Sequence, residues 1–296
     1  MRNLICAVLL AATVTSAGAQ QKFSSTQEAL SALTAAVKAE GHGSLIALLG
    51  PGAKNILVSG DPQEDLNARK SFLADLEQKV ELVNERGATF LHVGPDGWVF
   101  SIPLRESGGQ WAFDLKAGEK DLLARRVGRN ERKAMEVCRT VALAEREYAT
   151  RDWNGNRVLE YARKIRSTPG RQDGLYWEAR PGGLMSPLGP LVADAHAEGY
   201  STAKHEPYHG YYFRILTAQG PGAPGGAYDY VINGNMIGGF AVLAWPAKWG
   251  NSGVQTFMLS WNGELFERNL GPQTGALVQQ IDWFEPTGWT LVKGDR

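Results

Sequence analysis

The sequence is poor in cysteine, with only Cys6 and Cys138 in 296 residues. Cys6 lies in an N-terminal apolar stretch that we expect to be removed, which leaves Cys138 alone. One cysteine cannot form an internal disulfide, so the protein tolerates an oxidising compartment without using it for cross-links. Its stability must therefore come from its core.

The sequence also lacks a second long apolar run and an excess of charge of either sign. Beyond the N-terminus, no stretch approaches the roughly 18 consecutive apolar residues of a membrane-spanning helix, so we expect no membrane span. Basic and acidic side chains number 31 each and form no basic stripe. Nucleic acid is therefore not an expected partner.

Residues 1–19 have the three parts of a secretory signal peptide. Arg2 is the basic start, residues 4–14 form the apolar core, and residues 17–19 form a small-residue exit. We expect cleavage between Ala19 and Gln20. The mature protein is then predicted to be soluble and periplasmic or secreted.

The first part of the mature chain, residues 20–118, has a helical pattern followed by a strand pattern. Apolar side chains spaced three and four residues apart predict helices, and alternation predicts strands. The helices are expected from Ser24 or Ser25 to near Gly41, over 45–49 and over 65–84; the strands over 89–93, 98–104 and 110–115. Helices on one face of an antiparallel sheet give an α+β fold similar to the nuclear-transport-factor-like cone.

The second part, residues 119–296, begins with the longest expected helix, over about 119–150. Val137 and Val141 lie on its apolar stripe, Cys138 is expected to be a small packing residue beside it, and Glu145 is expected to face solvent. Shorter helices are expected over 158–165 and 191–197, and strands over 211–217, 228–232, 236–245, 254–261 and 264–268. This predicts one long helix against an antiparallel meander.

Several motifs in order resemble the bacterial domain-of-unknown-function family 2950. They lie at residues 126–131, 167–170, 173–177, 186–189, 208–213, 216–220, 225–230 and 250–257. The resemblance covers essentially the whole mature chain and implies no catalytic residues. Separately, residues 240–246, 253–257 and 262–263 after a long helix are similar to the globular half of type IV pilins and pseudopilins, without the pilin leader and its protruding hydrophobic helix.

Residues 205–209 contain the letters of a zinc-protease motif, with His205, Glu206 and His209. That chemistry needs both imidazoles on one helix face. Pro207 and the strand-forming tyrosines that follow oppose a helix, so we expect a loop and no zinc.

Residues 152–160 begin like a calcium loop, where side-chain oxygens converge on a hard cation. The EF-hand pattern fails because Arg157 replaces its glycine. Two interpretations remain: a turn between helices, or a looser calcium site. The site would use Asp152, Asn154, Asn156 and Glu160.

Aromatic side chains are dense in the second part. Tryptophan and tyrosine near polar anchors suit sugar or peptide recognition, although such rings also fill core gaps. The ligand-binding candidates are Tyr176, Trp177, Tyr208, Tyr211, Tyr228, Trp245 and Trp249.

Two functions stay open. The preferred one is a non-enzymatic binding or interaction module of the cell envelope, without a cofactor, whose partner is an envelope protein, peptide or glycan. The alternative is an envelope hydrolase acting on glycan or peptide, with acid/base candidates at Asp173, Glu206, His209 and Asp229. Convergence of these four side chains in one cleft would favour the hydrolase.

Overall fold

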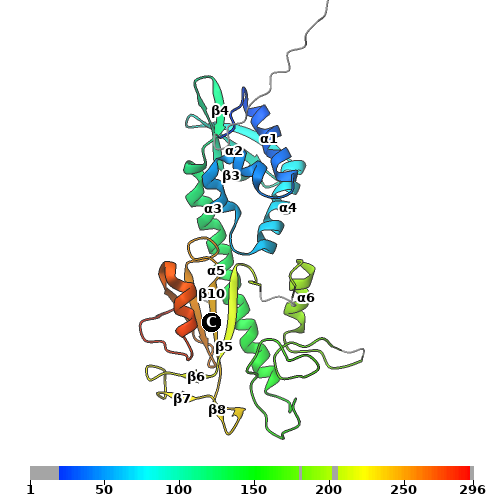
Figure 1. The fold of residues 1–296 in the computed structure, drawn as a ribbon, viewed down its shortest axis with the longest axis vertical. Helices are drawn as coiled ribbons and strands as arrows, with labels where there is room; N and C mark the ends of the chain where they lie inside the picture. Colours follow the sequence, from blue (N-terminus) through cyan, green and yellow to red (C-terminus); the bar gives the residue numbers. More distant parts are fainter. Residues whose placement is uncertain (1–19, 180–181, 202–205, 294–296) are drawn as a thin grey trace, which may run out of the picture. The chain divides into compact units, whose positions relative to one another are not determined.

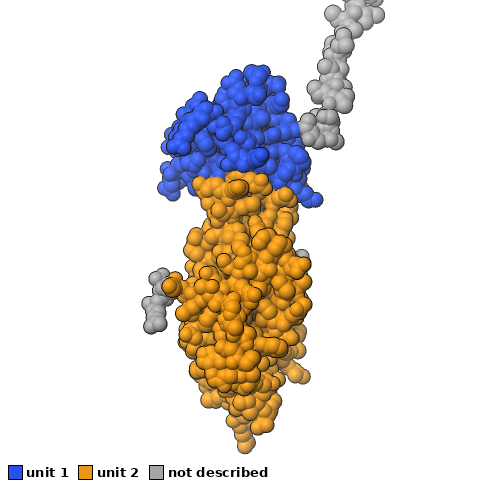
Figure 2. Space-filling view, turned by 90° about the vertical axis from the view of Figure 1, so that its left-hand side faces the viewer, with its two compact units in different colours: residues 1–54, 75–117 blue, residues 55–74, 118–296 orange. Residues whose placement is uncertain are grey.

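The computed structural model describes residues 20–179, 182–201 and 206–293; the expected signal peptide lies outside them. The chain forms two compact units, coloured separately in Figure 2. Unit 1 contains residues up to 54 and residues 75–117, and unit 2 contains residues 55–74 and those from 118 onward. Within the described ranges, no helix has both the length and the apolar character needed to cross a membrane.

Unit 1 packs two short helices against an antiparallel sheet. The helices are α1 (Thr26–Lys38) and α2 (Gly43–Leu49), followed by the 3₁₀ turn η1 (Pro51–Ala53). The strands pair in chain order: β1 (Val80–Glu85), β2 (Ala88–Val93), β3 (Trp98–Ser107) and β4 (Gln110–Phe113). Ser25 caps α1 by accepting a hydrogen bond from the Glu28 N–H. The buried stripe of α1 includes Leu30, Leu33 and Val37.

The helix predicted over 65–84 was wrong at its end. The helix of this region is α4 (Pro62–Gln78), which ends before β1 begins at Val80; the short α3 (Lys54–Leu57) precedes it. Val80 and Leu82 pair with Val93 and Leu91 of β2, so pairing with the neighbouring strand replaces the last helical turns. An apolar pattern this short is compatible with either structure.

Unit 2 is built on α5 (Leu115–Tyr148) from Gly118 onward and on a second antiparallel sheet (Figure 1). The sheet order is β13 (Thr290–Leu291), β12 (Leu265–Asn269), β11 (Gln255–Ser260), β10 (Ala241–Pro246), β5 (Tyr211–Leu216). The stripe of α5 joins a buried core with Tyr211, Ile215 and Phe257 of the sheet. The α+β class and the long helix with its antiparallel meander are therefore confirmed.

The C-terminal helices cover β10 and β5 from the other side. They are η2 (Gly271–Gln273), α7 (Thr274–Leu277) and η3 (Val278–Gln280). The guanidinium of Arg214 on β5 donates hydrogen bonds to the carbonyl oxygens of Val278 and Ile281, at 2.7 and 2.6 Å.

The segment between β5 and β10 forms two small hairpins. They contain β6 (Ala218–Gln219), β7 (Tyr228–Asp229), β8 (Val231–Ile232) and β9 (Asn235–Met236). Asn233 and Gly234 both have positive φ, 50° and 83°, as a two-residue type I′ hairpin requires. The single strand predicted over 236–245 is divided into β9 and β10.

Two predictions around the end of α5 were wrong. Residues 158–165 form no helix because their N–H groups bond elsewhere: Tyr161 donates to the Met236 carbonyl and Ala162 to the Glu145 carboxylate, both at 2.8 Å. Glu145 is thereby buried with no exposed surface rather than facing solvent. The helix predicted over 191–197 is present as α6 (Gly189–Ala197).

Candidate functional site

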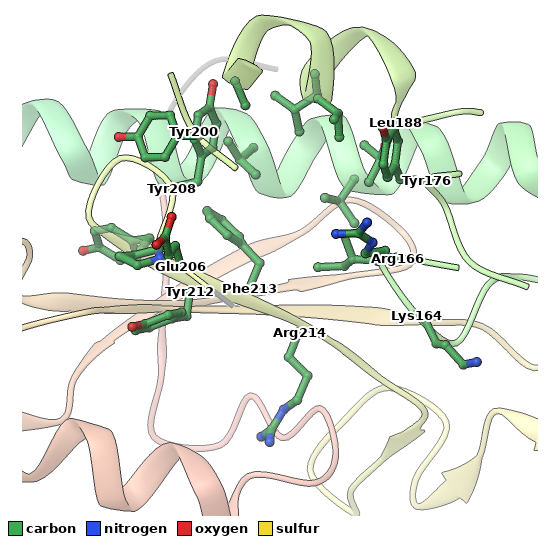
Figure 3. Close-up of a pocket in the computed structure, with 18 of the residues that line it drawn as sticks. Lys164, Arg166, Tyr176, Leu188, Tyr200, Glu206, Tyr208, Tyr212, Phe213 and Arg214 are labelled. Carbon is green, nitrogen blue, oxygen red and sulfur yellow. The ribbon is translucent and has the colours of Figure 1, made fainter. Parts of the chain in front are cut away.

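Unit 2 contains a slot of about 420 Å³ beside the edge strand β5 (Figure 3). The term slot refers below to this cavity. Its lining comes from α5, α6, residues 163–166, Tyr176, residues 200–201 and 206–208, and β5. Segments that are far apart in the sequence therefore meet around it.

One part of the lining is apolar and comes from two helices. Val137 and Val141 lie one turn apart on α5, so both project from the same face. On α6, Ala195 lies one turn from both Leu191 and Val192, so these three side chains also share a face. This lining favours apolar groups of a ligand, because burying them removes apolar surface from water.

A second part of the lining is phenolic. The rings of Tyr200 and Tyr208 meet edge to face with centroids 4.9 Å apart, and Tyr176 lies farther along the slot. Burial, followed by the charges of Glu198 and Asp194, raises the pKa of Tyr208, and burial raises the pKa of Tyr200 and Tyr176. These hydroxyls therefore stay neutral and act as hydrogen-bonding groups.

The main chain of β5 forms a third part of the lining. The side chains of Tyr212 and Arg214 point away from the slot, where both contact Trp245, with the Arg214 guanidinium 5.7 Å from its ring centroid. Phe213 projects to the opposite side, as Figure 3 shows. Tyr212 and Arg214 can therefore border the slot only through their backbone atoms.

The charged residues on the lining are Arg163, Lys164, Arg166, Glu206 and Arg214. Arg163 donates to the Gly234 carbonyl, and Arg214 donates to the carbonyls of Val278 and Ile281. The Arg166 guanidinium makes no hydrogen bond or ion pair with another residue of the described ranges. Lys164, in contrast, donates to Asp173 at 2.7 Å. Arg166 is thus the cation on this lining that is available to a ligand.

A cluster of Asp61, Glu64, Glu198, Tyr200 and His209 adjoins the slot and is called the His209 cluster below; Asp61 and Tyr200 are buried and Glu198 is exposed. The His209 Nδ1 lies 3.3 Å from a Glu64 oxygen, and its Nε2 lies 3.0 Å from a Glu198 oxygen. The Tyr200 hydroxyl contacts both Asp61 and Glu64. The imidazole is therefore held between two carboxylates that belong to α4 and to the end of α6.

The chain conformation at His209 depends on the next residue. His209 and Gly210 both have positive φ, 48° and 77°, and the Gly210 N–H donates to Asp61 at 2.8 Å. A side chain at Gly210 would place its Cβ 2.5 Å from the Asn130 amide nitrogen. Glycine is needed here for both conformation and space.

The carboxylates of Asp61, just before α4, and of Glu64, on α4, have opposite pKa shifts. A hydrogen bond from His209 lowers the pKa of Glu64, against the opposing effect of burial. Burial raises the pKa of Asp61, although the N–H groups of Glu64 and Gly210 oppose it. Across the described ranges, no three His, Cys, Asp or Glu side chains are arranged to hold a metal ion.

The four acid/base candidates occupy different surroundings. Glu206 borders the slot, and His209 is held by Glu64 and Glu198. Asp229, on β7, accepts the Val231 N–H at 2.7 Å.

Asp173 belongs to a surface ion pair. Burial would raise its pKa, but the Lys164 ammonium and the Thr168 N–H and hydroxyl outweigh that effect and lower the pKa to about 2. The carboxylate is therefore ionised and already bonded at neutral pH, which does not suit a general acid. His205 lies outside the described residues.

The aromatic candidates are divided between the slot and other places. Tyr176, Tyr208 and Tyr211 line the slot, although the Tyr211 hydroxyl points away and donates to the Gln255 carbonyl at 2.9 Å. Trp245 lies on the other face of the sheet.

The remaining aromatic candidates have partners elsewhere. Trp177 packs against Trp153, with ring centroids 4.8 Å apart. Trp249 donates to Asn269 at 2.8 Å, and the Tyr228 hydroxyl donates to the Gly238 carbonyl at 3.3 Å.

The calcium candidates form a hydrogen-bonded turn. The Asp152 carboxylate accepts the N–H groups of Gly155, Asn156 and Arg157. The amides of Asn154 and Asn156 both donate to one oxygen of Glu160, at 2.6 and 3.1 Å. These bonds order the loop by themselves, and the calcium hypothesis stays a prediction.

Several slot and cluster residues were not anticipated from the sequence. They are Asp61, Glu64, Val137, Val141, Arg166, Tyr200, Phe213 and Ile215. Asp61 and Tyr200 are 139 positions apart in the chain. The one local signal for the slot was the presence of Tyr211 at the start of the strand predicted over 211–217 and of Tyr208 just before it.

The chain belongs to the family described as protein of unknown function (DUF2950), whose model matches residues 20–292. Comparisons with curated proteins and with solved structures found no match. The resemblance to the family is thus confirmed over nearly the whole chain. The similarities to pilins and to nuclear-transport-factor-like folds stay predictions.

Proposed function

We propose, starting from a family that assigns no activity, that this protein is an exported envelope protein that binds a ligand in the slot without transforming it. The observation that carries the proposal is the lining: apolar side chains of α5 and α6 face neutral tyrosines, with Arg166 as a single available cation. Pockets with mostly apolar walls and few polar anchors are typical of ligand binding.

The ligand is an elongated, partly apolar component of the envelope, of the peptide or glycan class. Its apolar groups would contact Val137, Val141 and Val192, and its polar groups would bond the tyrosine hydroxyls. The predicted signal peptide supports the envelope as the location.

The hydrolase alternative has less support. Acid/base chemistry at a scissile bond needs two groups within reach of the same substrate atoms. Glu206 borders the slot, but Asp173 and Asp229 bond to other partners and the imidazole of His209 contacts two carboxylates.

Two tryptophan substitutions on α6 test the proposal. Ala195 lines the slot and Ala193 on the same helix is exposed, so Ala195→Trp fills the cavity while Ala193→Trp is the matched control. Purified residues 20–296 are titrated with muropeptides and with envelope-derived peptides by calorimetry. We expect Ala195→Trp to weaken binding at least about ten-fold, the loss of roughly 1.4 kcal/mol, and Ala193→Trp to leave it unchanged.

Two outcomes contradict the proposal. Equal affinities of the two variants would place the binding site elsewhere on the molecule. Turnover of a muropeptide or peptide, detected by mass spectrometry and abolished by a substitution at Glu206, would establish the hydrolase instead.

A further inference from the structure

Among the described residues, the outer edge of β5 is bonded at both ends and open between them. β5 is the last strand of its sheet, so only one side pairs with β10. On the other side, Tyr211 exchanges two backbone hydrogen bonds with Tyr208, at 2.8 and 3.1 Å, and the Thr217 carbonyl accepts the Tyr230 N–H at 2.8 Å. The open edge therefore lies between Tyr211 and Thr217.

Phe213 and Ile215 direct their N–H and C=O groups toward this open edge. In an antiparallel pair, residues alternate between bonding the partner strand and facing away from it. Tyr211 stands opposite Pro246, which has no N–H, and bonds outward, so residues 213 and 215 belong to the same outward set.

These four backbone groups have no partner among the described residues. The edge also borders the slot, because Tyr212 and Arg214 contribute only main chain to the lining. Two donors and two acceptors of one strand thus face an apolar and phenolic cavity.

We propose that the slot takes an extended polypeptide segment that pairs with the outer edge of β5 as an added strand. This inference rests on the proposed function and names the ligand class as peptide rather than glycan. A second polypeptide strand has donors and acceptors at the same two-residue repeat, about 6.8 Å, and lies about 4.8 Å from its neighbour. A glycan has no such repeat of amide donors and acceptors.

The lining defines the peptide further. Alternate side chains of an added strand point to opposite faces of the sheet, so every second residue faces Val137 and Val141 of α5 and should be apolar. The unpaired guanidinium of Arg166 favours an acidic side chain or a terminal carboxylate near it. The walls formed by α6 and residues 163–166 admit a single strand more readily than the sheet of a second copy.

The first test removes one outward N–H. A phage-displayed library of random decapeptides is selected on residues 20–296, and the enriched peptides are synthesised and titrated. Ile215→Pro deletes the outward N–H, a change that edge strands tolerate, whereas Ile215→Val reduces the side chain and keeps the N–H. We expect the proline variant to bind about ten-fold more weakly than the valine variant, because one backbone hydrogen bond is lost.

The second test follows amide hydrogen exchange in the unaltered protein, which does not depend on a variant that folds. In the free protein, the amides of Phe213 and Ile215 should exchange faster than those of Tyr212 and Arg214, which bond to β10. Saturation with a selected decapeptide should slow amide exchange at Phe213 and Ile215 at least about ten-fold. Exchange at Tyr212 and Arg214 should stay unchanged.

The outcomes separate this inference from the proposed function. Peptide binding that Ala195→Trp abolishes, but that leaves Phe213 and Ile215 exchange unaltered, overturns strand addition and keeps the slot as the binding site. Muropeptide binding without enrichment of any decapeptide overturns the peptide class. Slow amide exchange at Phe213 and Ile215 in the free monomer would show that the same chain covers the edge of β5. Slow exchange caused by self-association would show that a second copy covers it. Either result overturns the proposal.

Discussion

At the residue scale, Cys138 is a packing residue whose chemistry is suppressed by its surroundings. It has no exposed surface, and burial raises the pKa of its thiol to about 12. Thiolate is the reactive form. We therefore predict that iodoacetamide at about pH 8 leaves the native protein unmodified and alkylates Cys138 after denaturation, as read by intact mass. Rapid alkylation of the folded protein would contradict the buried position.

Glu145 should make the protein less stable as the pH rises. Burial raises the pKa of this carboxyl well above 4.5, and one of its oxygens has no hydrogen-bond partner among the described residues. A raised folded-state pKa means that the native state binds the proton more tightly. The free energy of unfolding therefore falls as the pH rises above about 4.5 through the raised value.

Glu145→Gln removes that ionisation and keeps an acceptor for the Ala162 N–H. We predict that the loss of unfolding free energy between about pH 5 and about pH 8 shrinks by more than about 1 kcal/mol, the value of one pKa unit. Denaturant unfolding at both pH values measures it. Glu147→Gln, at an exposed position on the same helix, is the control. It should not alter the slope of the unfolding free energy against pH. Identical slopes in wild type and Glu145→Gln would show that Glu145 is not buried in this way.

At the scale of elements, the His209 cluster joins the start of α4, the end of α6 and the residues just before β5. Glu64 and Glu198 face the imidazole, Tyr200 and Tyr208 pack against it, and Arg129 contributes charge at Glu64. Because the pKa of Glu64 is lowered, its contribution to stability is present above its ordinary value of 4.5 and is lost as the pH falls through the lowered value.

We predict that His209→Gln lowers the free energy of unfolding by about 1.5–3 kcal/mol at about pH 7, the range for hydrogen bonds to charged groups. The deficit should narrow as the pH falls below the ordinary glutamate value of 4.5 and Glu64 becomes protonated. Thermal unfolding across this pH range measures both effects. His196→Gln on the exposed face of α6 should change stability by less than about 0.5 kcal/mol. If the loss of unfolding free energy in His209→Gln did not depend on pH, the contact between His209 and Glu64 would not be its cause.

Helices with a cap or a long stripe were predictable from the sequence. Ser24 or Ser25 marked the start of α1, where Ser25 is the cap, and the stripe that includes Val137 and Val141 marked α5. The segments that failed have local patterns compatible with two structures. Residues 80–84 and 158–165 were predicted to be helical. Both adopt extended or irregular structure instead, in which their backbone groups bond to other segments of the chain.

The slot could not be predicted because its determinants are not local. The pattern of residues 211–217 is the same for an edge strand as for a central one, so the open side of β5 is invisible in the sequence. Asp61 reaches Gly210 and Tyr200 from 149 and 139 positions away. Only Tyr176, Tyr208 and Tyr211 of the predicted ligand-binding residues meet there.

At the scale of the whole molecule, residues 55–74 belong to unit 2 although they lie between the two segments of unit 1 in the chain. They carry Asp61 and Glu64, which bond to Gly210, Tyr200 and His209. A fragment of residues 118–296 lacks them and leaves these buried groups unpaired, which is costly.

We therefore predict that the fragment unfolds at least about 6 °C below residues 20–296, which corresponds to roughly 3 kcal/mol for a domain of this size. Calorimetry of both proteins measures the difference, and residues 20–296 carrying His196→Gln serve as a mildly altered control. Equal unfolding temperatures would show that unit 2 is complete without residues 55–74.

The location of the bound ligand tests the central claim most directly. Methyl-labelled residues 20–296 are titrated with a selected decapeptide, and methyl chemical shifts are recorded for all valines. The account predicts that the largest changes occur at Val137, Val141 and Val192, which line the slot. Changes confined to methyl groups near Tyr228 and Trp249, with the slot valines unmoved, would contradict it.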